Sequence, residues 1–293
     1  MTKHIVSQTG GFSVTFWGVR GTISTPGPDM SRYGGHTSCV QVQCGDVTFA
    51  LDAGSGIVNM GKQEFSHMHL LLSHTHIDHI IGLCCMGKMF QPDFKADIWA
   101  GHLLPEMQID EALMRLISPP IFPVPLDALE SRLAFHDFHA GRALHHTDFL
   151  NAGIKVHTIE LHHPDRATGY RIEYQDKSVC YITDIEHLRD GLDNRLIDFV
   201  SGTDMFIYDS TYDDAEFDTY EGWGHSTWQQ AIRIGEAAKV EHIVMFHHNP
   251  IATDDMLDQR AEKAHQQSRV RTTFAKEGTC YKLGEALGVK RVG

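Results

Sequence analysis

A run of seven residues at 73–79 (SHTHIDH) limits what this chain can fold into more than any other stretch of its sequence. It directly follows an apolar run of strand length, so its imidazoles and carboxylate are expected in a loop at the end of a buried strand. Such nitrogen and oxygen donors suit zinc and its first-row neighbours. Because alternate residues of an extended segment share a face, His74 and His76 can bind one ion. Asp78 and His79 follow the turn and can bind a second.

The charge balance favours a small anionic partner over a long nucleic acid. Lys and Arg number 25 against 38 Asp and Glu, which gives a net charge of −13 with His neutral, and the cations form no cluster along the chain. A protein that grips a long nucleic acid needs a basic surface to neutralise the phosphates. We therefore expect a small phosphodiester as substrate and no long nucleic acid as partner.

Composition also indicates the compartment. The sequence has no run of about 18 apolar residues, and its start lacks the charged and apolar regions of a signal peptide, so we expect neither a membrane span nor export. The six cysteines show no C-x-x-C spacing, and most lie among apolar residues. This pattern predicts reduced core cysteines in a cytoplasmic protein.

Strand and helix patterns alternate along the chain. Strands are expected at 12–17, 38–44, 47–52, 97–100, 155–159, 168–174, 178–183, 205–208 and 242–246, and helices at 80–89, 106–117 and 226–239. This alternation predicts an α/β fold with two sheets between layers of helices. No linker or repeat interrupts the pattern, so we expect a single domain over 1–293. The Pro- and His-rich stretch 118–150 is expected to form a loop or small subdomain over the site.

The quartet His74-x-His76-x-Asp78-His79 resembles the signature of the metallo-β-lactamase fold hydrolases. Further segments resemble the ribonuclease Z-like and cyclic-nucleotide phosphodiesterase branch of that superfamily, in the same order along the chain: 16–22 (FWGVRGT), 33–39 (YGGHTSC), 51–56 (LDAGSG), 181–184 (YITD), 224–227 (GHST) and 246–250 (FHHNP). The resemblance implies an αββα sandwich of two mixed sheets flanked by helices. It also implies two divalent metal ions, for which we expect zinc, while manganese and iron remain open.

The resemblance implies metal ligands beyond the quartet. His163 would complete the group around the first ion, and Asp184 would bridge the two ions. A histidine near the C-terminus would complete the second group, and the family pattern favours His247 if the preceding strand runs straight. A bulge would select His248 instead, because a shift of one residue reverses the facing of a strand. The expected ligands are therefore His74, His76, Asp78, His79, His163, Asp184 and His247.

The same resemblance supplies catalytic residues. His225, in the Gly-His-Ser-Thr element, would protonate the leaving oxygen, and Asp209 would orient its ring. Asp78 is expected both to bind a metal ion and to take part in catalysis. The Gly-His-Ser-Thr element is what narrows the resemblance to phosphodiester chemistry.

Three other residues are candidates for roles around the metals. Asp52 is expected to orient a metal-bound histidine, although a turn before glycine would also explain it. His36 stands in a Gly-rich loop where family members more often carry asparagine, so it bears on base or sugar preference. Arg20 could pair with a phosphate or form a structural salt bridge.

We expect a phosphodiesterase that opens a 3′,5′-cyclic nucleotide to a nucleoside monophosphate, with a hydroxide held between the metals and His225 as general acid. A ribonuclease Z-like tRNA 3′-end nuclease is an alternative, but the basic arm of such enzymes is missing from the sequence. A lactonase or thioesterase would not need the pair of His225 and Asp209. A non-catalytic scaffold is disfavoured because every expected ligand position holds a competent residue. A homodimer is implied by the resemblance alone.

Overall fold

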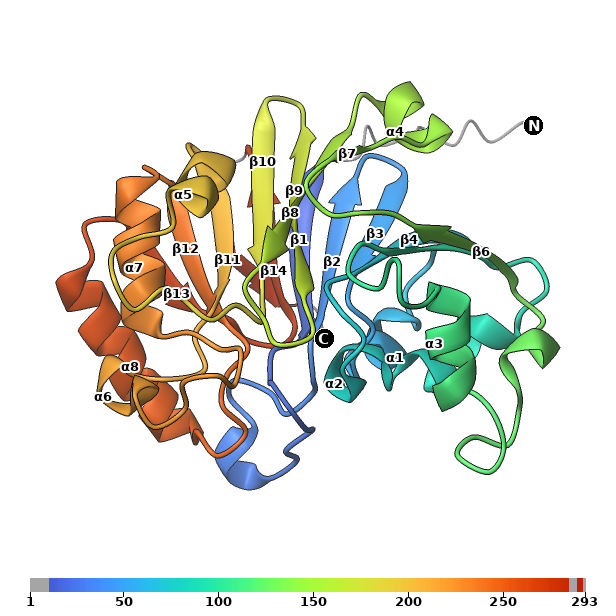
Figure 1. The fold of residues 1–293 in the computed structure, drawn as a ribbon, viewed down its shortest axis with the longest axis horizontal. Coiled ribbons are helices and arrows are strands. Elements are labelled where there is room, and N and C mark those ends of the chain that lie inside the picture. The colour runs from blue at the N-terminus through green and yellow to red at the C-terminus, as the bar shows by residue number, and fades with distance from the viewer. Residues whose placement is uncertain (1–10, 285–288, 292–293) are drawn as a thin grey trace, which may run out of the picture.

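The computed structural model describes residues 11–284 and 289–291 of the chain. Two mixed β-sheets pack face to face, and helices cover their outer surfaces (Figure 1). One sheet has the strand order β15-β14-β1-β2-β3-β4-β5-β6, and the other has the order β13-β12-β11-β10-β9-β8-β7. This arrangement confirms the predicted αββα sandwich.

The first sheet consists of β1 (Phe12–Gly18), β2 (Cys39–Cys44), β3 (Val47–Leu51), β4 (His67–Leu72), β5 (Lys95–Ala100), β6 (Arg132–Asp137), β14 (Thr279–Leu283) and β15 (Val289–Arg291). The second consists of β7 (Ala143–Leu144), β8 (Lys155–Leu161), β9 (Ala167–Tyr174), β10 (Lys177–Ile182), β11 (Met205–Asp209), β12 (His242–Phe246) and β13 (Arg271–Phe274). The α-helices are α1 (Ile57–Met60), α2 (Ile77–Ile80), α3 (Ile109–Leu116), α4 (Thr147–Ala152), α5 (Asn194–Val200), α6 (Asp214–Phe217), α7 (Trp228–Ala237) and α8 (Asp254–Gln267). Short 3₁₀ turns occupy Pro28–Met30, Leu83–Cys85, Gly87–Phe90 and Leu126–Ala128.

Apolar side chains form three layers of core. The layer between the sheets contains Phe16, Leu51, Tyr181 and Phe246, all buried. A second layer lies between the first sheet and α1 and α3, and a third lies between the second sheet and α5, α7 and α8. Central strands such as β12 are buried along their whole length because both of their faces are covered. None of the described helices is both long and apolar enough to cross a lipid bilayer.

Several predicted elements differ from the structure. The helix expected at 80–89 is broken into the end of α2 and two 3₁₀ turns that start after Gly82 and at Gly87. Glycine is a poor helix former, which explains the breaks. The stretch 118–150, expected as a loop or small subdomain, instead supplies β6 to the edge of the first sheet and β7 to the edge of the second. It therefore carries the chain across from one sheet to the other.

Candidate metal centre

The predicted ligands gather at one edge of the sandwich, where strands of both sheets end. β3 and β4 run parallel, as do β10, β11 and β12, so their carboxyl ends meet at the same edge. Each of these strands ends at a site residue or within two residues of one: Asp52, His74, Asp184, Asp209 and His247. Clefts beside the carboxyl ends of parallel strands are the usual binding sites of α/β proteins.

Three histidines form the first group, namely His74, His76 and His163. Their ligand nitrogens lie within 4.8 Å of one another. The ring of His74 is 4.4 Å from that of His76 and 4.7 Å from that of His163. Burial lowers the pKa of His163 to about 4, so its imidazole is neutral and has a lone pair for a metal.

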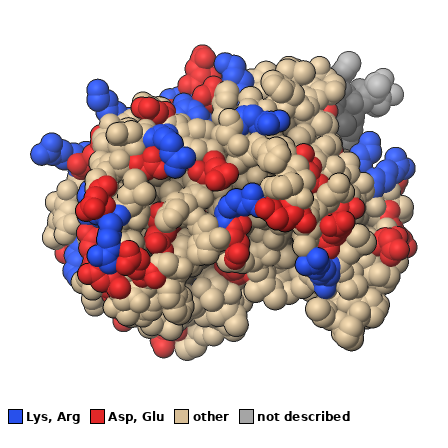
Figure 2. Space-filling model, in the orientation of Figure 1, with Lys and Arg blue, Asp and Glu red and all other residues tan. Residues whose placement is uncertain are grey.

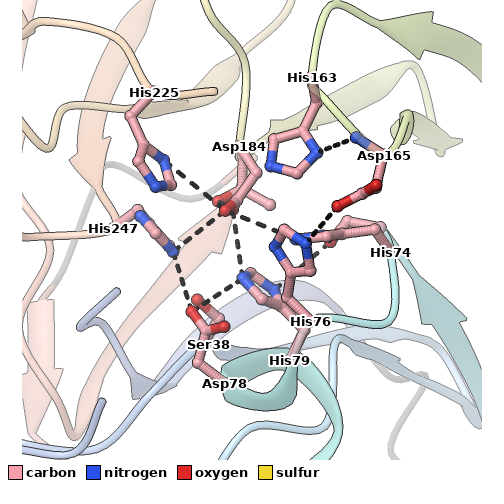
Figure 3. A network of polar contacts seen from close by, with 12 residues as sticks. Ser38, His74, His76, Asp78, His79, His163, Asp165, Asp184, His225 and His247 are labelled. Atoms are coloured by element: carbon pink, nitrogen blue, oxygen red, sulfur yellow. Dashed lines mark hydrogen bonds and ion pairs between the residues drawn. The ribbon is translucent and has the colours of Figure 1, made fainter. Parts of the chain in front are cut away.

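Asp184 lies at the centre of a second group (Figure 3). Its Oδ2 is 3.3 Å from Nε2 of His79, and its Oδ1 is 3.4 Å from Nε2 of His247 and 3.8 Å from Nε2 of His74. Oδ2 of Asp78 lies 3.1 Å from His79 Nε2 and 3.3 Å from His247 Nε2. The Asp184 carboxylate thus faces both groups, which is the position that a bridging ligand needs.

These residues fit divalent metal ions. The Nε2 atoms of His74 and His79 are buried and have no hydrogen-bond partner, although buried polar atoms are nearly always paired. Burial lowers the pKa of His79, but the carboxylates of Asp184, Asp78 and Asp52 outweigh it and raise that pKa well above its ordinary value. Carboxylates that hold a proton this strongly also attract a divalent cation.

The structure separates the two candidate histidines at the end of β12. His247 has a left-handed backbone with φ 59°, which turns its ring toward Asp78 and Asp184. His248 points away, because its Nε2 lies 2.9 Å from the carbonyl oxygen of Ala275 and its ring packs against aromatic neighbours. His247 is thus the histidine that the fold places in the metal centre, and His248 has no access to it.

The predicted acid and its partner lie beside this centre. Nδ1 of His225 is 2.9 Å from Oδ2 of Asp209. The same atom lies 3.7 Å from Oδ1 of Asp184, a contact drawn in Figure 3. Burial lowers the pKa of His225, but Asp209 and then Asp184 and Asp78 outweigh it and raise the pKa to about 9. Metal ions would offset the charge of Asp184 and Asp78, so Asp209 is the carboxylate that keeps a proton on the ring.

Glu186 holds the loop that carries His225, a role that the sequence left open. Its Oε2 accepts hydrogen bonds from the backbone N–H groups of Gly222 at 2.6 Å and Gly224 at 3.0 Å. Gly224 has φ 83°, and a Cβ atom there would lie 2.4 Å from the ring of His163. Because Gly224 has no side chain, the loop that carries His225 can pack directly against His163 of the first ligand group.

Asp52 is hydrogen-bonded to the ring of His79. Its Oδ2 accepts from Nδ1 of His79 at 2.8 Å, from the Ser73 hydroxyl at 2.8 Å and from the Tyr181 hydroxyl at 2.7 Å. Its Oδ1 accepts from the Ser73 backbone N–H at 2.7 Å. The carboxylate thereby fixes the ring so that Nε2 of His79 points into the centre.

The positions of Arg20 and His36 do not support the contacts with substrate that the sequence suggested for them. Arg20 is fully buried, and its guanidinium donates to the carbonyl oxygens of Gly34 and Ala252, so it cannot reach a substrate phosphate. The alternative expectation, a structural salt bridge, fits, since Oδ1 of Asp254 lies 3.9 Å from Nη2 of Arg20. His36 contacts Ser55 and Asn59 near α1 and lies outside the pocket at the centre, which removes its expected bearing on base preference.

Sequence reasoning missed two residues that touch the centre, Asp165 and Thr22. Asp165 lies 2.9 Å from His76 Nε2, and its backbone N–H donates to Nδ1 of His163 at 3.4 Å. The backbone N–H of Thr22 donates to Oδ2 of Asp78 at 2.8 Å. The position of Asp165, two residues after a predicted ligand, was a usable signal. Thr22 carried none, because only the fold brings it to the quartet.

Comparisons with known proteins agree with this geometry. A family model described as a beta-lactamase superfamily domain matches residues 61–248. Ribonuclease Z of Thermoplasma acidophilum is 33% identical over 76 residues, a segment that spans 26% of this chain and 25% of that protein. The chain therefore matches about a quarter of that relative's length.

Solved structures share the fold over nearly the whole chain. The metallo-beta-lactamase fold protein YhfI from Bacillus subtilis has a TM-score of 0.67 at 17% identity, covering 93% of this chain and 100% of its own. The short form of human tRNase Z has a TM-score of 0.66 at 16% identity, covering 92% and 99%. A diphosphatase from the PhnP family has a TM-score of 0.65 at 16% identity, covering 95% and 100%. At these identities the similarity concerns the fold.

The contact between Asp52 and His79 predicts a loss of metal affinity in Asp52→Asn. Without the carboxylate, His79 is held less firmly, and we expect affinity for zinc to fall by about 10–100-fold. Competition with a chromophoric chelator measures this. Asp46→Asn, an exposed residue of the turn before β3, is the matched control and should bind like the wild type. Equal affinity in both variants would contradict the orienting role.

Proposed function

The chain belongs to the β-lactamase superfamily and is a metallo-β-lactamase fold hydrolase, and from this premise we propose that it is a dinuclear phosphodiesterase. The proposed substrate is a small cyclic nucleotide with a 3′,5′ linkage, and the product is a nucleoside monophosphate. The observation that carries the proposal is the pair of His225 and Asp209 beside the Asp184 carboxylate.

The proposed metal ligands are His74, His76, Asp78, His79, His163, Asp184 and His247, and zinc is the proposed ion because imidazole and carboxylate suit it. Divalent ions bound there would act as Lewis acids toward a phosphate and lower the pKa of water.

The chain itself supplies the proton for the leaving group. Asp209 accepts the Nδ1–H of His225, which fixes the ring and leaves its second N–H free to act as a general acid. When the P–O bond to the ribose breaks, the departing oxygen takes this proton and leaves as a hydroxyl. Opening a cyclic phosphodiester releases a ribose oxygen as an alkoxide, and the pair of His225 and Asp209 can supply the proton that this oxygen needs.

A pocket of about 460 Å³ opens beside His225 and has a size suited to one nucleotide. Tyr212 and Tyr220 stack in its wall with ring centroids 4.4 Å apart and ring planes 3° apart. Trp223 and Ile251 also line it, with 63% and 72% of their surfaces exposed. Exposed aromatic and apolar side chains next to a phosphate-binding centre suit a base that stacks on them.

The distribution of charge supports a small substrate. Acidic and basic side chains are interspersed on the face shown in Figure 2, without a continuous basic stripe. A phosphate backbone of many nucleotides would meet carboxylates as often as cations on such a face. A single phosphodiester needs only the metal centre.

A tRNA 3′-end nuclease remains the second candidate function. It is favoured by the 33% identity to ribonuclease Z, a match confined to 76 residues. The same centre and the same pair of His225 and Asp209 would serve either reaction, so the two candidates differ in what binds outside the metal centre.

We also propose a cytoplasmic location. All six cysteines are free, and four are buried: Cys39, Cys44, Cys84 and Cys180. Reduced thiols of this kind are typical of a reducing compartment.

Replacement of the acid should separate catalysis from metal binding. We expect His225→Ala to lower kcat on 3′,5′-cyclic AMP by about 10²–10⁴-fold, the contribution typical of a general acid, while zinc content stays unchanged. Chromatography of the products after incubation of metal-loaded protein with the cyclic nucleotide measures this, and precursor tRNA is tested in parallel. Cleavage of the tRNA with no turnover of any cyclic nucleotide would replace the proposal by the nuclease.

Removal of the Asp209 charge should shift the pH profile. The acid must be protonated, so activity falls as pH rises through the pKa of His225. The isosteric Asp209→Asn removes the largest cause that raises this pKa. The alkaline limb of kcat/KM should therefore move to lower pH in the variant. An unchanged alkaline limb would show that His225 is not the titrating acid.

The aromatic wall predicts a binding defect in Trp223→Ala. We expect KM for the cyclic nucleotide to rise by about 5–100-fold, because loss of one stacking contact costs about 1–3 kcal/mol, while kcat changes little. Steady-state kinetics over a range of substrate concentrations distinguishes the two constants. Leu150→Ala, an exposed apolar residue of α4 outside the pocket, is the control. A KM equal to that of the control would mean that the base lies elsewhere.

A further inference from the structure

A second cluster of imidazoles and carboxylates lies at the opposite end of β4 from the metal centre. It consists of His67, His69, Asp97, His136, His146 and Asp148, which we call the edge cluster. His67 begins β4, whereas the catalytic ligands follow its last residue. None of the edge cluster residues lines the pocket beside His225.

The first sheet and α4 build this cluster. His67 and His69 are two residues apart on β4, so they share a face. Asp97 stands opposite His69 in the parallel pairing of β4 and β5. His136 stands opposite Trp99 on β6, and its ring stacks on the indole with centroids 4.0 Å apart.

The segment before α4 closes the cluster from above the sheet. Nδ1 of His146 accepts the backbone N–H of Asp148 at 3.2 Å, which caps α4 and fixes both side chains. The ring of His146 lies 4.8 Å from that of His69. The chain crosses from β6 of the first sheet to β7 of the second before it reaches this segment (Figure 1).

Asp97 is surrounded by imidazole nitrogens. Its Oδ2 lies 2.6 Å from Nε2 of His67 and 3.9 Å from Nδ1 of His69. Its Oδ1 lies 2.7 Å from Nε2 of His136 and 3.9 Å from Nε2 of His146. The two shorter contacts are hydrogen bonds, and the ligand atoms of His67, His69 and Asp97 all lie within 4.8 Å of one another, near enough to converge on one ion.

Asp148 makes a similar set of contacts. Its Oδ2 lies 3.2 Å from Nε2 of His69, 3.4 Å from Nδ1 of His67 and 3.7 Å from Nδ1 of His146. Each ion pair that the described residues record for Asp97 and Asp148 is with a histidine. The cation that balances these two carboxylates is therefore supplied either by protonated imidazoles or by a metal ion.

His69 distinguishes these two possibilities. Its side chain is only 1% exposed, and its Nδ1 has no hydrogen-bond partner although it points toward Asp97. A protonated ring would carry an N–H there without a close acceptor, which is costly in a buried position. A lone pair directed at a metal ion leaves nothing unpaired.

We propose that the edge cluster binds one divalent first-row transition ion, for which zinc is the expected occupant. His67, His69 and Asp97 are the proposed first ligands, since their ligand atoms lie within 4.8 Å of one another. His136 or His146, both beside the other oxygen of Asp97, completes four-coordination. The side chains of His67 and His136 are 33% and 31% exposed, so an ion can enter from solution.

The ion would fasten β4 and β5 to each other and, through the fourth ligand, to β6 or to the residue that caps α4. Its binding energy adds to the stability of the folded chain, because the unfolded chain has no such site. The edge cluster takes no part in the proposed phosphodiester chemistry.

Zinc content tests the proposal. Chelator-treated protein is saturated with zinc and freed of excess ion, and the metal is measured by mass spectrometry. We expect about three zinc ions per wild-type chain and about two in the double variant His67→Gln/His136→Gln, with kcat unchanged. His145→Gln, an exposed histidine outside the cluster, is the matched control and should keep the wild-type content. Equal zinc content in all three proteins would overturn the proposal.

A measurement on the wild type covers the case in which the double variant does not fold. Crystals soaked in zinc are examined by anomalous diffraction at the zinc edge. A peak within bonding distance of Nδ1 of His69 supports the site. Peaks at the catalytic centre without one at His69 would show that protonated histidines balance Asp97 and Asp148. Activity is unaffected by this outcome, so it leaves the proposed function standing.

Discussion

The buried carboxylate of Asp52 is the interaction on which the rest of the site depends. A charge without solvent contact is very unfavourable unless hydrogen bonds surround it, and Asp52 accepts four: two from Ser73, one from His79 and one from Tyr181. Ser73 and His79 belong to the first sheet side and Tyr181 to β10 of the second, so this carboxylate joins both sheets. The ends of the strands cannot separate without exposing an unpaired charge in the core. The metal ligands are therefore placed before any ion binds.

The backbone at the centre departs from regular strand geometry where ligands are needed. Asp52, Asp184 and His247 all have φ between 53° and 61°, although left-handed conformations are uncommon for residues other than glycine. Each stands just after a buried strand, and the turn directs its side chain across the sheet edge. The ring of His247 packs directly against Gly21, where a Cβ atom would lie only 2.3 Å from the ring. The packing of the strands stabilises these three residues by more than their left-handed backbone conformations cost.

The sequence predicted the parts of the fold and site that local patterns encode. The run 73–79 stands in seven consecutive residues and follows β4, and β12 reads as an apolar run, so both segments lie where the sequence predicted them. The choice between His247 and His248 depended on one left-handed residue, which no periodicity reveals. The sequence left Arg20 open between a phosphate contact and a structural salt bridge, and only the tertiary structure shows its burial against the carbonyl groups of Gly34 and Ala252. The edge cluster escaped notice for a related reason, since strand register brings together residues spread from 67 to 148.

β4 connects the two clusters through its buried apolar residues Leu70, Leu71 and Leu72. Its first residues point into the edge cluster, and its last residues lead into the catalytic loop, so one strand is held at both ends. The edge cluster lies at the start of the strand, where the ring of His69 packs against Phe49, Trp99 and Phe149. An ion bound there would add a few directed bonds to this packing. At the proposed catalytic centre, bound ions would have to keep positions open for substrate. If both proposals hold, β4 carries a structural ion site at its start and leads into a catalytic site at its end.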